Sequence, residues 1–138
     1  MKTTLLAATL SLFAFAAQAQ LEISDANHNL KGYFRKDGTV LDKNQKTLCQ
    51  FHQGGRITDA QSNVLGYIVN EYEIQDKNHK TQAYIFPDGK VENAKHELIG
   101  RIRKDGNGPV VDASDKVIGY ITTIEPMWAA AYFFMLKY

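Results

Sequence analysis

Residues 55–68 read GRITDAQSNVLGYI, and five other windows of the chain repeat this pattern without gaps. The six windows begin at residues 21, 38, 55, 72, 89 and 108, so each step is 17 residues except the last, which is 19. Self-similarity at a fixed period is the signature of a repeat architecture. We therefore interpret residues 21–121 as six copies of one structural unit.

Two positions of the unit are apolar in every copy and indicate strands. The third is always Ile or Val and the fourteenth always Phe or Ile, residue types that favour strands. The third-position residues are Ile23, Val40, Ile57, Ile74, Val91 and Val110. The fourteenth-position residues are Phe34, Phe51, Ile68, Ile85, Ile102 and Ile121. We expect both sets to face the interior.

Polar residues in the middle of each unit indicate a turn. The fifth position is Asp in five copies and Asn93 in the other, and both residue types accept a hydrogen bond from the backbone two residues on. Asp-Gly pairs at 37–38, 88–89 and 105–106 mark turns between units. The sequence therefore predicts an all-β domain: an antiparallel meander of six 17-residue β-hairpin repeats, arranged like a flower or barrel around a pseudo-axis.

The twelfth position of the unit is always small, which indicates close approach by other backbone or side chains. Its residues are Gly32, Cys49, Gly66, Ala83, Gly100 and Gly119. Cys49, the single cysteine, cannot form an internal disulfide. We interpret it as a small buried apolar residue; a reactive thiol is the alternative.

The thirteenth position is tyrosine in four copies: Tyr33, Tyr67, Tyr84 and Tyr120. Side chains alternate across a strand, so these rings lie on the face opposite to the core. Two interpretations are open. The rings pack on neighbouring hairpins, or they line a binding surface for a glycan or a peptide.

The last 17 residues, 122–138, lie outside the repeat. Pro126 suits the first turn of a helix, and three consecutive alanines, 129–131, favour one. The segment is apolar on all sides, which predicts burial. We expect a short helix, or alternatively a final strand, that plugs the open end of the hairpin array. An exposed docking patch for a partner is the other interpretation.

Residues 1–19 have the features of a secretory signal peptide. Lys2 provides the positive region, residues 5–17 are apolar, and Ala17-Gln18-Ala19 matches a cleavage site. Cleavage after Ala19 would leave residues 20–138 as one domain, with the repeats at 21–121 and a cap at 122–138. We expect a periplasmic or extracellular protein. The apolar run of the leader is too short to span a membrane, and so is the apolar C-terminal segment, so we expect no transmembrane segment in the mature chain.

Composition and spacing argue against several classes of site. The chain has 16 lysines and arginines, of which Lys2 lies in the leader, and 15 acidic residues. The mature chain would therefore carry no net formal charge, and nucleic-acid binding is not expected. Three of the four histidines share the eighth position, on separate hairpin tips: His28, His79 and His96. The fifth-position carboxylates offer one acid per loop in most copies, too few for calcium. We predict no metal, no cofactor and no catalytic residue; Glu71, Glu73 and Glu97 are candidate carboxylates without distinguishing features.

The unit G-x-[VI]-x-D followed by [VI]-[LI]-G-Y-I, repeated behind a signal peptide, resembles the bacterial β-flower repeat proteins. The resemblance covers residues 21–121, and the four-fold β-flower domain is the member compared. It implies small exported domains in which hairpins radiate around a central axis, and it carries over no activity or functional residues. This chain departs by showing six units and not four.

These observations favour a non-enzymatic binding or interaction module of the cell envelope, whose partner would be an envelope protein or a glycan. The four thirteenth-position tyrosines are its candidate binding residues. The alternative is a small hydrolase or an inhibitor-like protein with its site at the mouth of the hairpin array. A pocket holding two or more titratable groups within hydrogen-bond reach of each other would favour the enzyme.

Overall fold

A computed structural model describes residues 19–138. The predicted signal peptide, residues 1–19, lies outside the described residues apart from Ala19. The first strand begins at Gln20, next to the expected cleavage point.

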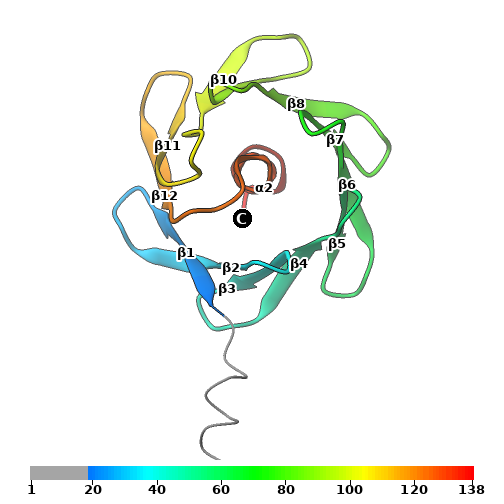
Figure 1. Ribbon diagram of the computed structural model, residues 1–138, viewed down its shortest axis with the longest axis vertical. Coiled ribbons are helices and arrows are strands. Elements are labelled where there is room, and N and C mark those ends of the chain that lie inside the picture. The colour runs from blue at the N-terminus through cyan, green and yellow to red at the C-terminus, as the bar shows by residue number, and fades with distance from the viewer. Residues whose placement is uncertain (1–18) are drawn as a thin grey trace, which may run out of the picture.

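Twelve antiparallel strands make up the domain, in the order that the meander predicts. They are β1 (Gln20–Asp25), β2 (Leu30–Arg35), β3 (Thr39–Asp42), β4 (Thr47–Phe51), β5 (Arg56–Asp59), β6 (Val64–Val69), β7 (Glu73–Asp76), β8 (Thr81–Ile85), β9 (Lys90–Glu92), β10 (Leu98–Arg101), β11 (Gly108–Asp112) and β12 (Val117–Ile121). Each strand pairs with its neighbours in sequence, and β1 closes the ring against β12 through the pair Ile23 and Ile121. Figure 1 shows the hairpin tips pointing outward from this ring. The all-β meander is confirmed, although its units are not equal, since the strands range from three to six residues.

The fifth-position carboxylate organises each hairpin tip. In the third unit Asp59 Oδ1 accepts hydrogen bonds from the backbone N–H groups of Gln61 (2.9 Å) and Asn63 (2.8 Å). These bonds hold Ser62 in the left-handed region at φ 69°, and the bond from Asn63 is the main reason why the pKa of Asp59 is lowered. Asn93 makes the equivalent pair of bonds in the fifth unit. The repeated acids are therefore turn residues.

Replacing this acid should lower stability in a pH-dependent way. Because the folded-state pKa of Asp59 is depressed, its contribution is present above the unfolded-state pKa and is lost as the pH falls through the folded-state value. We expect Asp59→Ala to lower the melting temperature by a few degrees at pH 7 and by less at pH 3. Asp59→Asn should retain the turn, as Asn93 does, and act as the matched control. Equal losses for both variants at both pH values would contradict the carboxylate's role.

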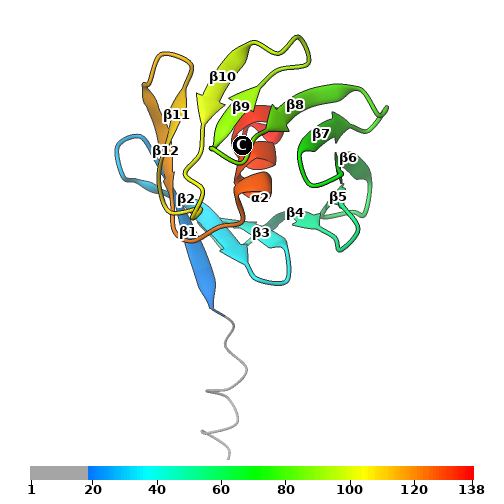
Figure 2. The same cartoon turned by 45° about the horizontal axis from the view of Figure 1, so that its top comes forward.

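The interior of the ring is filled by the C-terminal segment. This segment forms α2 (Pro126–Ala130) and continues as a wider π-helical turn, η1 (Ala131–Leu136). It lies inside the ring of strands (Figures 1 and 2). Ala129, Ala130, Ala131 and Tyr132 are buried. The predicted plug is therefore confirmed as a helix. The interpretation of this segment as an exposed docking patch is wrong, because these side chains face the strands.

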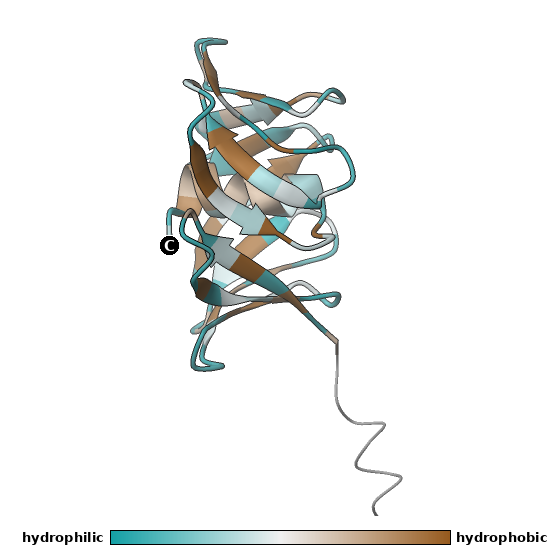
Figure 3. Cartoon of the chain, turned by 90° about the vertical axis from the view of Figure 1, so that its left-hand side faces the viewer, coloured by the Kyte–Doolittle hydropathy of each residue, from teal (hydrophilic) through white to brown (hydrophobic). Residues whose placement is uncertain are grey.

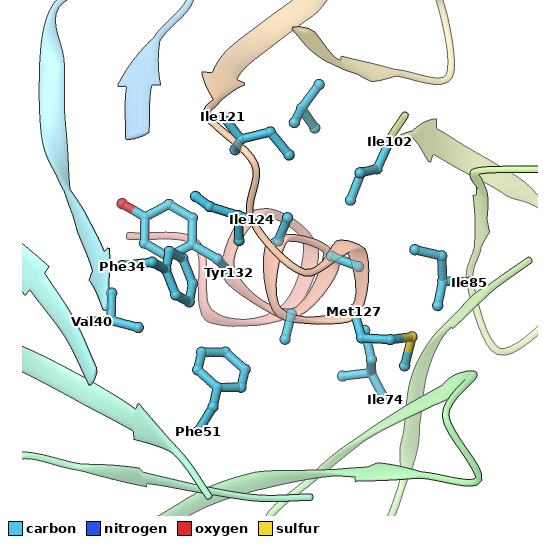
Figure 4. Close-up of a cluster of buried hydrophobic side chains, with 14 of the residues drawn as sticks. Phe34, Val40, Phe51, Ile74, Ile85, Ile102, Ile121, Ile124, Met127 and Tyr132 are labelled. Atoms are coloured by element: carbon cyan, nitrogen blue, oxygen red, sulfur yellow. The ribbon is translucent and has the colours of Figure 1, made fainter. Parts of the chain in front are cut away.

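The third and fourteenth positions form the wall around this plug. All six third-position residues are fully buried. Five of the six fourteenth-position residues are also buried, and Ile68 is partly buried. Figure 4 shows side chains such as Phe34, Phe51 and Ile102 pointing inward at the helix. The Trp128 ring stacks on Phe51 at 5.5 Å and on Phe34 at 6.0 Å. Figure 3 shows the polar tips and links at the outer edges of the sheet.

Candidate functional site

The outward tyrosines stack on histidines of the next hairpin. Ring centroids are 4.3 Å apart for Tyr67 and His79, and 4.8 Å apart for Tyr84 and His96. The pair of Tyr120 and His28, at 4.0 Å, continues this pattern across the closure of the ring. Thirteenth-position and eighth-position residues of successive units are therefore neighbours, which supports the packing interpretation for three of the four tyrosines.

The fourth tyrosine differs, and the four lie on four different hairpins. Tyr33 has Gln45 at the eighth position of the next unit, where the other three have histidine. All four rings are partly exposed and lie on different hairpins around the outside of the ring. They form a repeated outer surface without converging on a pocket. Ligand binding by Tyr33, Tyr67, Tyr84 and Tyr120 stays a prediction.

Two cavities lie instead at one end of the ring, where the links between hairpins meet the start of α2. They measure about 260 and about 570 Å³ and share Glu71, Glu125 and Met127. We call this end, with its two cavities, the mouth. The smaller cavity is walled by apolar residues, among them Phe86 and Pro87. The larger has polar walls and is lined by His52, Gln53, Asn70 and Trp128.

A break in the repeat places Tyr72 at the smaller cavity. Three other units begin with a left-handed glycine that packs against a backbone carbonyl, namely Gly38, Gly55 and Gly89. The fourth unit begins with Tyr72 and compensates through the preceding turn, in which Asn70 and Glu71 are both left-handed at φ 54° and 64°. That conformation costs about 1–2 kcal/mol for a residue such as glutamate. The Tyr72 ring is 45% exposed and stacks on Tyr84 at 6.0 Å.

The charged groups of the mouth are distributed unevenly between its two cavities. Glu71 and Glu125 are exposed, and within residues 19–138 neither carboxylate makes a hydrogen bond or an ion pair with another side chain. Lys104 borders the smaller cavity only. His52 has its Nε2 2.7 Å from the hydroxyl of buried Thr58, which fixes the ring on the side of the larger cavity. The larger cavity therefore has two carboxylates and no formal positive charge among its lining residues.

The other candidate groups from the sequence lie elsewhere. Glu73 accepts hydrogen bonds from Gln75 (2.8 Å) and Thr81 (2.6 Å), which lower its pKa. Glu97 accepts a bond from Asn93 at a hairpin tip. Cys49 lies inside the ring, and burial raises its pKa to about 12, so its thiol stays protonated at neutral pH. The reactive-thiol interpretation is therefore not supported.

Two negative findings apply to the described part of the chain. Among residues 19–138, no three or more His, Cys, Asp or Glu side chains are grouped so that they could hold a metal ion. In the same residues no helix has the length and apolar character needed to cross a membrane.

The sequence-based site prediction missed most of the mouth. Its residues come from four separate links and from the start of the plug, so no contiguous motif marks it. The signal that was available is the break at residues 70–72, where the first-position glycine is absent. Among the candidate carboxylates only Glu71 reaches the mouth.

Comparison with known proteins gives one match. A family model described as "5-fold beta-flower protein" matches residues 19–137, which is nearly the whole described chain. No curated protein and no solved structure matches.

Proposed function

Because the chain belongs to the 5-fold beta-flower protein family, we propose that it is an exported binding module of the cell envelope whose ligand enters the mouth. The resemblance to β-flower proteins is thereby confirmed, with a five-fold rather than a four-fold family description. Export rests on the signal-peptide features of residues 1–19. The binding role is argued from the site, because a fold alone does not determine function.

The pair of cavities around Glu71, Glu125 and Met127 is the observation that carries this proposal. Small-ligand sites are concave, largely apolar and supplied with a few polar groups. The mouth combines Met127 and Phe86 with two carboxylates that lack partners in the described chain. None of the four outward tyrosines lines either of these two cavities, and three of them already stack on histidine.

Tyr72→Ala should separate the two candidate surfaces. We expect it to weaken binding of any ligand found on glycan and peptide arrays by about tenfold, because a partly exposed aromatic ring at a cavity is a common source of binding energy. Tyr33→Ala removes a ring of the same kind from the outer surface and is the matched control. The measurement is titration calorimetry of residues 20–138 with each array hit.

The opposite pattern, with binding lost in Tyr33→Ala and retained in Tyr72→Ala, would transfer the site to the outer surface. Turnover of a bound glycan or peptide, followed by mass spectrometry, would support the hydrolase alternative over a binding module.

A further inference from the structure

We propose that the mouth binds an extended peptide segment of an envelope protein that presents an arginine beside an apolar residue. This inference rests on the proposed function and adds the chemical class of the ligand. It combines the shape of the two cavities, the charges on their rims and the exposed ring of Tyr72.

The two cavities are adjacent, which favours an extended ligand. Both are bordered by Glu71, Glu125 and Met127, so they meet over the start of α2. Figure 4 shows Met127 on the side of the plug that faces Ile74 and Ile85. A ligand that spans both cavities crosses the two carboxylates at its centre.

The junction of the two cavities favours a positively charged ligand group. Both carboxylates border both cavities, while Lys104 borders only the smaller one. A positively charged ligand group gains from both acids wherever it sits along the junction, and an anionic ligand is repelled there. Since both carboxylates are exposed, the attraction is partly screened and should weaken as salt is added.

The Tyr72 ring favours arginine over lysine. It is packed nearly parallel to Tyr84, at an interplanar angle of 18°, so one face is supported from behind. A planar guanidinium can stack on such a ring while it donates two hydrogen bonds to a carboxylate. Glu71, which precedes Tyr72 and borders the same cavity, provides a carboxylate for this contact. An ammonium group makes neither of these planar contacts.

The smaller cavity is largely apolar and the larger one is polar, and this combination fits a peptide. The smaller cavity offers Phe86, Pro87 and Met127 to an apolar side chain. The larger cavity is open at Gly54, where a Cβ atom would meet nothing within 4 Å, so a ligand backbone can approach this link closely. Gln53 and Asn70 beside it can bond to peptide groups.

Citrulline gives a direct test, because it is the neutral isostere of arginine. The probes are acetyl-Leu-Arg-Leu-amide, its citrulline analogue and acetyl-Leu-Lys-Leu-amide, titrated into ¹⁵N-labelled residues 20–138. We expect shifts of amide signals at residues 52–55, 70–72 and 125–127, and an affinity for the arginine peptide about tenfold above that for citrulline. The lysine peptide should bind with intermediate affinity.

Glu71→Gln and Glu125→Gln should each reduce the arginine affinity by about three- to tenfold and reduce its salt dependence. Glu22→Gln removes an equal charge from β1, outside the mouth, and should change neither. Equal binding of the arginine and citrulline peptides at the mouth would overturn the cation proposal and leave the proposed function standing. Binding of N-acetylglucosamine oligomers at the mouth, with no response to any peptide, would overturn the peptide proposal only. Binding that leaves the mouth signals unchanged would overturn both.

Discussion

A chain that ends at Ile124 should not form a stable ring. Deleting residues 125–138 removes α2 and η1, which supply Met127, three buried alanines and Tyr132 to the core. Loss of one large aromatic side chain from a core costs about 3–5 kcal/mol. The deletion removes several such contributions at once, against a total stability of about 5–15 kcal/mol for a domain. The expected result is a chain that is unfolded or aggregated at 25 °C.

Far-UV circular dichroism, size-exclusion chromatography and dye binding to exposed apolar surface measure this outcome. A chain that ends at Lys137 is the matched control, since it loses only Tyr138, whose exposed fraction is 38%. The control should remain a folded monomer of somewhat lower melting temperature. A soluble monomer with an intact sheet after removal of residues 125–138 would show that the ring does not need the plug.

Much of this fold could be predicted because its determinants are local and recur along the chain. A third-position residue such as Ile57 indicates a strand, and a turn acid such as Asp59 indicates the turn of the same hairpin. The same residue types recur at these positions in the other copies, which strengthens the prediction. The plug was predictable for a related reason, since a segment that is apolar on all sides needs burial wherever it lies. The closure of β1 on β12 had no comparable local signal.

The candidate site was less predictable because it depends on contacts between units. The stacking of Tyr120 on His28 joins the last hairpin to the first, and only the closed ring brings them together. Glu71 and Glu125 are 54 positions apart in sequence and meet at the same two cavities only because the plug turns back into the ring. The break at Tyr72 was visible in the sequence, but its consequence required the position of α2.

The small twelfth position explains how the ring and the plug fit together. A Cβ atom at Gly119 would lie 2.6 Å from Cε1 of Phe133 and 2.8 Å from the carbonyl oxygen of Ser24. At Gly66 it would lie 2.9 Å from Cε of Met135 and would also meet the carbonyl oxygen of Gln75. Real Cβ atoms essentially never come within 3.0 Å of other heavy atoms. The plug side chains therefore occupy the space that the missing side chains leave.

Gly119→Val and Gly66→Val should both destabilise the domain by overpacking, at about 3 kcal/mol, the upper end of the usual range, because a backbone carbonyl cannot move aside cheaply. For a domain of this size that corresponds to a fall in melting temperature of roughly 10 °C. Cys49→Ala, a change at the same position where a Cβ atom is already accommodated, is the control and should cost less. Adding Phe133→Leu to Gly119→Val should recover part of the loss, since it relieves the ring contact but leaves the clash with Ser24. Unchanged melting temperatures for both valine variants would mean that the strands can move apart from the plug, and the close approach at this position would then not hold the ring together.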